Sequence, residues 1–151
     1  MGDLTGKVVF LTGAGRGVGV GLALALGKAG ASIGLFGRTR ETLEQTASKL
    51  NDLGVKSLVC VGDTSIRTDV ERAVGDVERA LGPVWALVNN AYSAERTMVA
   101  DISEEILDGA LRGCLHGTLF AMQACFPTMK ERGGRIINFG SGAATTGLPE
   151  M

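Results

Sequence analysis

Short apolar runs alternate along this chain with longer stretches of helical periodicity. The short runs predict strands, mostly buried on both faces, at Val8–Leu11, Ser32–Phe36, Ser57–Val61, Val84–Val88 and Arg135–Phe139. The longer stretches predict helices at Val18–Ala29, Arg40–Leu53, Ser65–Leu81 and Ser103–Arg132. Strands and helices that alternate in this way favour a parallel α/β sheet with right-handed crossover connections.

Residues that stop or cap helices lie near several of the expected helix ends. Gly54 and Gly82 are suited to end the second and third helices, and Pro83 follows the latter. Asp101, with Glu104 three residues later, predicts a cap for the last helix.

The last predicted helix carries small residues spaced four apart, and positions with this spacing share one helix face. They are Gly109, Gly113, Gly117, Ala121 and Cys125. Each glycine inside a helix costs about 1 kcal/mol relative to alanine, so close packing is expected in compensation. The face packs either onto the chain's own sheet or onto the helix of a partner subunit.

A glycine-rich loop joins the first predicted strand to the first predicted helix. It reads T-G-A-G-R-G-V-G from Thr12 to Gly19. Backbone N–H groups and a helix N-terminus at such a loop face an anion, usually the pyrophosphate of a dinucleotide. The pattern G-x-G-x-x-G fails because Val18 takes the place of its third glycine, and the phosphate-loop pattern also fails. The pattern that fits is T-G-x-x-x-G-x-G.

This loop resembles that of the short-chain dehydrogenase/reductase family, and two later motifs extend the resemblance. Asn89-Asn90-Ala91-Tyr92 is similar to the family's N-N-A-G, and the segment from Gly134 to Ser141 is similar to its fifth strand and catalytic serine. The resemblance implies a Rossmann-like doubly wound parallel sheet of about five strands in the order 3-2-1-4-5. We expect residues 1–151 to form a single dinucleotide-binding domain, incomplete at its C-terminal side.

The resemblance also implies which residues bind the cofactor. They are Thr12, Gly13, Gly15, Arg16, Gly17, Val18, Gly19, Arg38, Asp63, Thr64, Asn90 and Ala91. In this family the aspartate hydrogen-bonds the adenine edge, although Asp63 could equally cap the helix that follows it. Ser141 is expected to hydrogen-bond the substrate carbonyl.

The end of the second strand indicates which dinucleotide is preferred. NAD-specific folds place an acidic residue there to hold the ribose 2′-hydroxyl. This chain has Gly37-Arg38 instead, and its nearest acids, Glu41 and Glu44, lie inside the next helix. The guanidinium of Arg38 suits a 2′-phosphate, and Arg16 adds a second cation. We therefore expect NADP(H) to be preferred over NAD(H).

The resemblance breaks at the residues that handle the proton. The family's general acid is a tyrosine with a lysine four residues later, but the only tyrosine here is Tyr92 and it has no such lysine. Cys114 stands where many members have a catalytic asparagine, and Tyr92 replaces a glycine. Ser141 alone represents the catalytic tetrad.

Two explanations of this break remain open. In the first, which we favour, the chain is the N-terminal part of a longer NADP(H)-dependent oxidoreductase that interconverts a carbonyl and an alcohol, and is inactive alone. In the second, it is a non-catalytic NADP(H)-binding sensor or scaffold protein.

Composition narrows the partners of the chain. A formal net charge of −1 argues against nucleic-acid or membrane-surface binding. Three cysteines without C-x-x-C spacing indicate neither a disulfide framework nor a metal site, and favour a cytoplasmic location. No signal peptide or membrane span is expected. We expect a small-molecule substrate, and the resemblance implies a homo-oligomer formed through the 103–132 helix.

Overall fold

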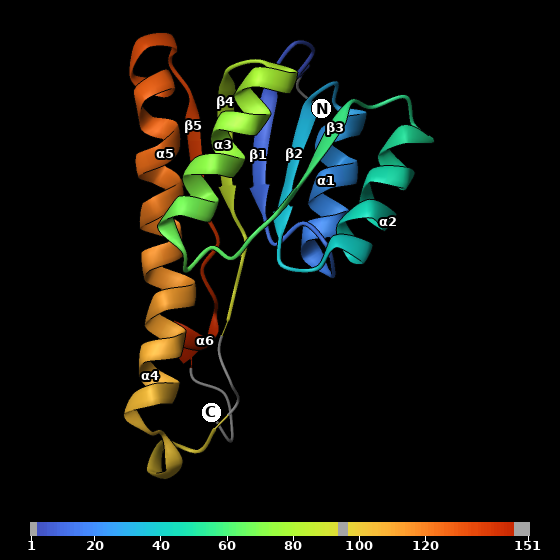
Figure 1. The fold of residues 1–151 in the computed structure, drawn as a ribbon. Helices are drawn as coiled ribbons and strands as arrows, with labels where there is room; N and C mark the ends of the chain where they lie inside the picture. Colours follow the sequence, from blue (N-terminus) through green and yellow to red (C-terminus); the bar gives the residue numbers. More distant parts are fainter. Residues whose placement is uncertain (1–2, 94–96, 147–151) are drawn as a thin grey trace.

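A computed structural model describes residues 3–93 and 97–146. Its core is a five-stranded sheet in the order β3-β2-β1-β4-β5, in which every pairing is parallel (Figure 1). The strands are β1 (Val8–Thr12), β2 (Ser32–Gly37), β3 (Ser57–Val61), β4 (Val84–Asn89) and β5 (Arg135–Asn138). The predicted Rossmann-like fold and strand order are confirmed.

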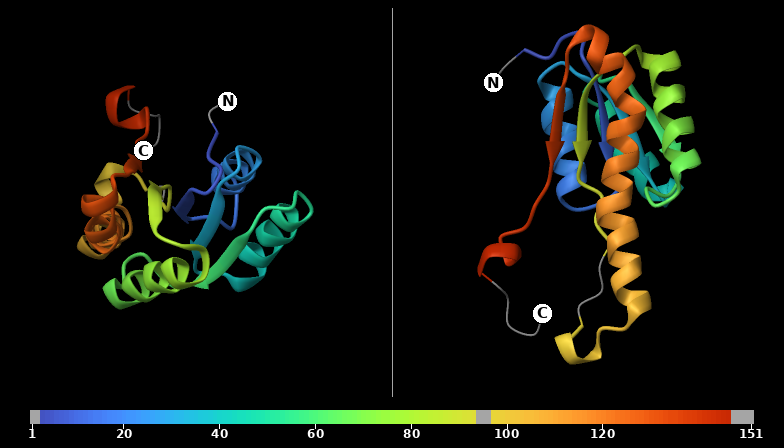
Figure 2. Two further views of the ribbon diagram at one scale, coloured as in Figure 1. Left: turned by 90° about the horizontal axis from the view of Figure 1, so that it is seen from above. Right: turned by 90° about the vertical axis from the view of Figure 1, so that its left-hand side faces the viewer.

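Helices cover both faces of the sheet, which gives three layers (Figure 2). One face carries α1 (Val18–Lys28) and α2 (Arg40–Asn51), and the other carries α3 (Arg67–Leu81) and α5 (Gly117–Arg132). Gly82 ends α3 with φ of +108°, as its position in the sequence predicts.

The central strand supplies both layers of the core because successive side chains point to opposite faces. Val8 and Phe10 pack in the cluster under α3 and α5, whereas Val9 and Leu11 pack in the cluster under α1 and α2. Both faces of β1 are therefore apolar, which is why it appears in the sequence as a continuous apolar run.

Strand β5 differs from the other strands in its burial. It occupies an edge of the sheet, and all four of its residues are exposed. The apolar run predicts the strand itself but does not say what covers it.

The last predicted helix is one continuous rod with a change of winding inside it. After the short 3₁₀ turn η1 (Val99–Asp101), the rod consists of α4 (Glu104–Ala110), the π-helical segment η2 (Leu111–His116) and α5. Its true cap is Ser103, whose hydroxyl accepts a hydrogen bond from the Ile106 N–H at 3.3 Å. The predicted cap at Asp101 is therefore wrong.

The small-residue stripe of this rod faces the chain itself. Cβ atoms at Gly113 and Gly117 would come within 2.6 Å of Ser93 and 2.8 Å of Thr64, respectively. Ala121 and Cys125 are fully buried beneath the sheet. Four of the five stripe residues therefore pack within the chain, as the first alternative predicts, whereas Gly109 is exposed and has nothing within 4 Å of its Cβ position.

A different stripe of the same rod is exposed. It consists of leucines spaced four apart, Leu107, Leu111, Leu115 and Leu119.

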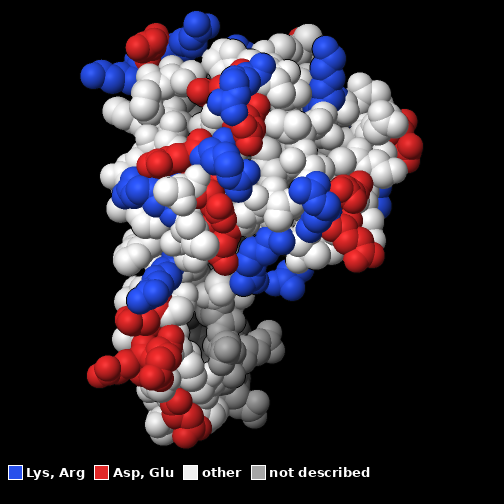
Figure 3. All heavy atoms as spheres, in the orientation of Figure 1, with Lys and Arg blue, Asp and Glu red and all other residues white. Residues whose placement is uncertain are grey.

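Over α3, basic and acidic side chains alternate, whereas acidic side chains dominate the surface around α4 (Figure 3). No helix in the described part of the chain is long and apolar enough to cross a membrane.

Candidate functional site

The site lies where the parallel strands end, since their carboxyl ends meet at one edge of the sheet. A cavity of about 590 Å³ opens there. It is lined by the loops that follow β1, β2, β3 and β4 and by the start of the long rod. The structure brings together all but one of the residues expected to bind cofactor, namely Gly13, Gly15, Arg16, Gly17, Val18, Gly19, Arg38, Asp63, Thr64, Asn90 and Ala91.

The glycine loop is shaped so that few side chains fit it. Gly13 and Gly17 have φ of +67° and +53°, which side chains rarely adopt. A Cβ at Gly13 would lie 2.9 Å from the Ala91 Cα, and one at Gly19 would overlap the carbonyl oxygen of Gly13. Around Gly17, in contrast, the space is open. The loop thus leaves its backbone accessible on the cavity side, as an anion cradle requires.

Thr12 lies beneath the loop rather than in the cavity wall. Its buried hydroxyl oxygen accepts hydrogen bonds from the N–H groups of Asn90 and Ala91, at 3.1 and 3.0 Å. The side-chain amide of Asn90 donates in return to the carbonyls of Thr12 and Gly13, at 3.1 and 3.2 Å. These bonds fasten the end of β1 to the end of β4, so the glycine loop and the N-N-A-Y segment are positioned together.

Helix α2 holds the loop from the other side. The hydroxyl of Thr46 is buried and lies 3.1 Å from the carbonyl oxygens of both Ala14 and Thr42. The sequence carries no signal for this contact, because a threonine within a helix is unremarkable until α2 is placed against the loop.

The cavity is basic at the side formed by the first two loops. Arg16 and Arg38 line it there with their side chains exposed, and Arg112 of η2 adds a third guanidinium. Among the described residues, Asp63 is its only acidic lining residue. Glu44 instead pairs with Arg40 at 3.4 Å, outside the cavity. The arrangement attracts an anionic ligand.

The β3–α3 loop is ordered by hydrogen bonds around Asp63. Its carboxylate accepts from the N–H and the hydroxyl of Ser65, both at 2.8 Å, while its own N–H donates to the Asp69 carboxylate at 3.0 Å. This last bond, followed by pairing with Arg72, lowers the pKa of Asp69 below its ordinary value. Thr64 packs against Gly117, which joins this loop to the long rod.

Ser141 lies just past β5 and outside the residues that line the cavity. The strand before it is tied to β4: the N–H of Phe139 donates to the Asn89 carbonyl at 3.0 Å, and the Asn89 amide donates to Asn138 Oδ1 at 2.9 Å. The structure therefore brings Ser141 to the same edge of the sheet as the cavity.

Several lining residues were not expected from the sequence. They are Thr39, Thr42, Ser65, Ser93, Gly109, Arg112 and Gly113, together with Tyr92, which was noted only as a departure from the motif. The Cys114 thiol donates to the carbonyl of Ser93, the residue after Tyr92, at 3.4 Å. The arginine and glycines of the rod could not be assigned to the cavity before the rod's orientation was known.

Within residues 3–93 and 97–146, no group of three or more His, Cys, Asp or Glu side chains is arranged to hold a metal ion. The described lining residues offer backbone N–H groups, guanidinium groups, hydroxyls, the Asp63 carboxylate and the Asn90 amide.

Comparison with known proteins gives consistent matches. The family model for short chain dehydrogenases matches residues 7–151. A 12alpha-hydroxysteroid dehydrogenase from Clostridium sp. is 34% identical over 97% of this chain and 60% of its own length. The 11-beta-hydroxysteroid dehydrogenase-like 4A protein of Arabidopsis thaliana is 33% identical over 98% of this chain and 50% of its own.

A solved structure matches over a similar extent. The crystal structure of L-sorbose reductase from Gluconobacter frateurii, complexed with NADPH and L-sorbose, superposes with a TM-score of 0.91 and 28% identity. The match covers 99% of this chain and 57% of that one. The chain thus spans about half to three fifths of the length of these relatives.

Proposed function

The chain belongs to the short-chain dehydrogenase family, and from that premise we propose that it forms the cofactor-binding part of an NADP(H)-dependent oxidoreductase. The reaction is hydride transfer between nicotinamide and a small carbonyl or alcohol substrate. The observation that carries the proposal is the cavity of about 590 Å³, which runs from the glycine loop past Arg38 to Asp63 and Asn90. A relative of similar fold binds NADPH, which supports the assignment.

The residues present fit a dinucleotide. The positive φ values at Gly13 and Gly17 and the exclusion of a Cβ at Gly19 leave the loop backbone free to cradle a pyrophosphate. Asp63 would accept a hydrogen bond from the adenine amine, and Asn90 and Ala91 would contact the cofactor elsewhere along the cavity.

Arg38 and Arg16 hold the 2′-phosphate in this proposal. Guanidinium groups pair with phosphate through two parallel hydrogen bonds, whereas a ribose 2′-hydroxyl needs a carboxylate acceptor. The cavity offers the former at this position, and the one acid among its described lining residues, Asp63, belongs to the β3–α3 loop. The preference for NADP(H) over NAD(H) follows from that chemistry.

The bound nicotinamide supplies or accepts the hydride, while the residues of the protein orient the two reactants. Ser141 hydrogen-bonds the substrate carbonyl. A proton donor must act at the same oxygen, and the only tyrosine, Tyr92, lacks a lysine four residues later. The 151-residue chain by itself should therefore show no turnover of carbonyl substrates with NADPH.

A non-catalytic NADP(H)-binding sensor or scaffold is the second candidate, favoured by the cysteine at position 114 and by Tyr92 in the N-N-A-Y segment. It predicts that NADPH changes the binding of a protein partner without being oxidised. Turnover by the chain that survives Ser141→Ala would contradict both the expected inactivity and the role of Ser141.

We further propose a homo-oligomer formed through the 103–132 helix and a cytoplasmic location. The exposed leucines at positions 107, 111, 115 and 119 support the oligomer, since monomers rarely leave such a stripe uncovered. Sedimentation of the purified chain at a monomer mass at high concentration would contradict this contact.

The cofactor preference has a direct test in Arg38→Asp. The variant should weaken NADPH binding about 10- to 100-fold while changing NADH binding by less than about threefold, because only the 2′-phosphate loses its partner. Arg40→Asp is the matched control: it makes the same charge change two residues away, at a side chain outside the cavity. Equal weakening of both dinucleotides by Arg38→Asp would contradict the 2′-phosphate role.

A further inference from the structure

The first turn of α3 reaches back to the loop that precedes it. The helix begins at Arg67, and its N-cap residue, Ile66, has no side-chain acceptor for the free N–H groups. The acid of this turn, Asp69, uses one carboxylate oxygen to accept the N–H of Asp63 at 3.0 Å. The helix thereby fixes the backbone at the residue that lines the cavity.

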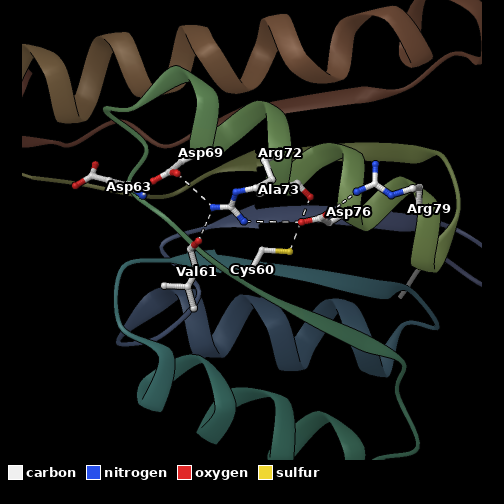
Figure 4. Close-up of polar contacts among 8 residues, drawn as sticks. All are labelled: Cys60, Val61, Asp63, Asp69, Arg72, Ala73, Asp76 and Arg79. Carbon is white, nitrogen blue, oxygen red and sulfur yellow. Dashed lines mark hydrogen bonds and ion pairs between the residues drawn. The ribbon is translucent and has the colours of Figure 1, made fainter.

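Arg72, one turn further along, fixes the same loop at a second point. Its Nη2 donates to the Val61 carbonyl at 2.9 Å and to the other oxygen of Asp69 at 3.3 Å. Its Nη1 lies 3.8 Å from the Asp76 carboxylate, which also pairs with Arg79 (Figure 4). The loop is therefore held at a carbonyl before Gly62 and at an N–H after it.

Gly62, between these two points, packs closely against the core and α3. A Cβ there would lie 2.7 Å from the Phe36 ring and 3.0 Å from the Asp69 Cβ. The backbone at Gly62 is thus packed between the core and α3. This packing sets the direction in which the Asp63 side chain leaves the backbone.

The Asp63 carboxylate points away from Asp69 (Figure 4). Its Oδ1 accepts both hydrogen bonds from Ser65, and in the described part of the chain no hydrogen bond reaches Oδ2. One carboxylate oxygen is therefore available at the cavity wall, in a direction set by the bonds of Asp69 and Arg72 to the backbone.

We propose that Asp69 and Arg72 are positioning residues that aim the Asp63 carboxylate at the exocyclic amine of the adenine. This inference rests on the function proposed above and deepens it at the adenine end of the site. The ion pairs of Arg72 are partly exposed, and such pairs add little to stability. Their effect is expected in ligand recognition, where a small misplacement of an acceptor weakens a hydrogen bond steeply.

The lowered pKa of Asp69 agrees with this role. Its first cause is the N–H of Asp63, so the ionised form is the one that holds the loop. Asp69 accordingly remains charged at neutral pH, and the contact persists under the conditions in which a dinucleotide would bind.

The test compares the binding of NADPH with that of reduced nicotinamide hypoxanthine dinucleotide phosphate, in which a carbonyl replaces the adenine amine. The full chain should prefer NADPH about tenfold or more, since the exocyclic carbonyl of the analogue cannot donate to Asp63 and is a second acceptor facing it. Asp69→Ala should reduce this preference to about threefold or less. Asp69→Asn, which keeps an acceptor oxygen, should restore much of it, and Arg72→Gln should reduce it by a smaller factor.

Glu71→Gln is the matched control, because it breaks the exposed Arg67–Glu71 pair of 3.6 Å on the same helix without touching the loop. It should change the preference by less than about twofold. In the Asp63→Ala background, Asp69→Ala should have no further effect on the preference, whereas a merely structural role would weaken both ligands equally in every background.

The possible failures are distinguishable. If the unmodified chain binds neither dinucleotide, the proposed function fails and this inference falls with it. If it binds both equally well, Asp63 does not read the adenine amine and the positioning role is overturned while NADP(H) binding stands. If it prefers NADPH and Asp69→Ala keeps the full preference, only the positioning role is overturned.

Discussion

Strands β1 and β5 run parallel in one sheet, yet their side chains meet very different surroundings. All five residues of β1 are buried, with helices packed over both faces, whereas all four residues of β5 are exposed at the sheet edge. Each strand leads directly into the candidate site: β1 into the glycine loop and β5 toward Ser141.

The difference separates the site into two parts. The loops that follow β1, β3 and β4 are fixed by hydrogen bonds within this chain, in which Thr46 and the Asn90 amide donate and the side chains of Thr12 and Asp69 accept. Strand β5 and the residue after it are tied to β4 through their backbone, but Ile136, Ile137 and Phe139 remain exposed. The part of the site that we propose binds the cofactor is therefore built by the packing of this chain, whereas the part near Ser141 is only partly enclosed by it.

The largest expected difference between a buried strand and the exposed strand β5 concerns two isoleucines. Ile33 of β2 is fully buried and Ile137 of β5 is 47% exposed. Ile33→Ala should lower the free energy of unfolding by about 2–5 kcal/mol, because it removes buried methyl groups and opens a cavity. Ile137→Ala should cost less than about 1 kcal/mol. Denaturant unfolding of both variants gives the values, and equal losses would contradict the contrast between the strands.

A second test of the difference between packed and open positions compares two glycines of α1 that lie about half a turn apart. A Cβ at Gly19 would overlap the Gly13 carbonyl oxygen, whereas nothing lies within 4 Å of one at Gly21. Gly19→Ala should lower stability by about 1–3 kcal/mol and weaken NADPH binding, since the loop must move. Gly21→Ala should raise stability by about 0.5–1 kcal/mol through helix propensity. Thermal unfolding and a binding titration check both, and a Gly19→Ala variant that binds NADPH normally would argue against the cradle.

The smallest expected effect is a dependence of stability on alkaline pH, caused by the buried thiols of Cys60 and Cys125. Burial raises the pKa of Cys125 to about 12, and burial together with Asp76 raises that of Cys60 to about 11, both from an ordinary value of 9.0. A thiol whose pKa is higher in the folded chain than in the unfolded chain stabilises the folded chain fully at pH values below the unfolded pKa. The free energy of unfolding should therefore fall as the pH rises from about 9 toward the folded pKa values. Each thiol contributes at most about 1.4 kcal/mol per pH unit.

Unfolding of the unmodified chain and of Cys125→Ala at several alkaline pH values tests this. The variant should show a shallower loss of stability with pH. An identical slope would mean that Cys125 becomes accessible to solvent before the chain unfolds, and that the core does not extend to α5 as described.

Much of the cofactor-binding part could be predicted from the sequence because its signals are local. The apolar runs predicted the first residue of all five strands correctly, and they predicted the last residue of each strand to within one residue. The glycine pattern, Arg38, Asp63 and Asn90 each follow directly after a strand, so the parallel topology brings them together. What could be predicted is therefore what depends on residue type and position within a strand–loop–helix unit.

The remaining features depend on contacts between units. The π-helical winding of η2 occurs where Gly113 packs against Ser93, twenty residues earlier in the chain, and no local pattern indicates it. The contacts of Thr46 with Ala14 and of Asp69 with Asp63 likewise require the helices to be placed first. The exposure of β5 does not follow from its own run of apolar residues, because burial depends on neighbouring elements that the run does not specify.

The central claim is that the packing of this chain builds an NADP(H) site. It is tested most directly by titrating the purified chain with NADPH and with NADH and measuring both dissociation constants. The account predicts saturable binding of NADPH at one site, about tenfold or more tighter than NADH, because only NADPH presents a 2′-phosphate to Arg38 and Arg16. Absence of NADPH binding by the folded chain, or equal affinity for NADH, would contradict it.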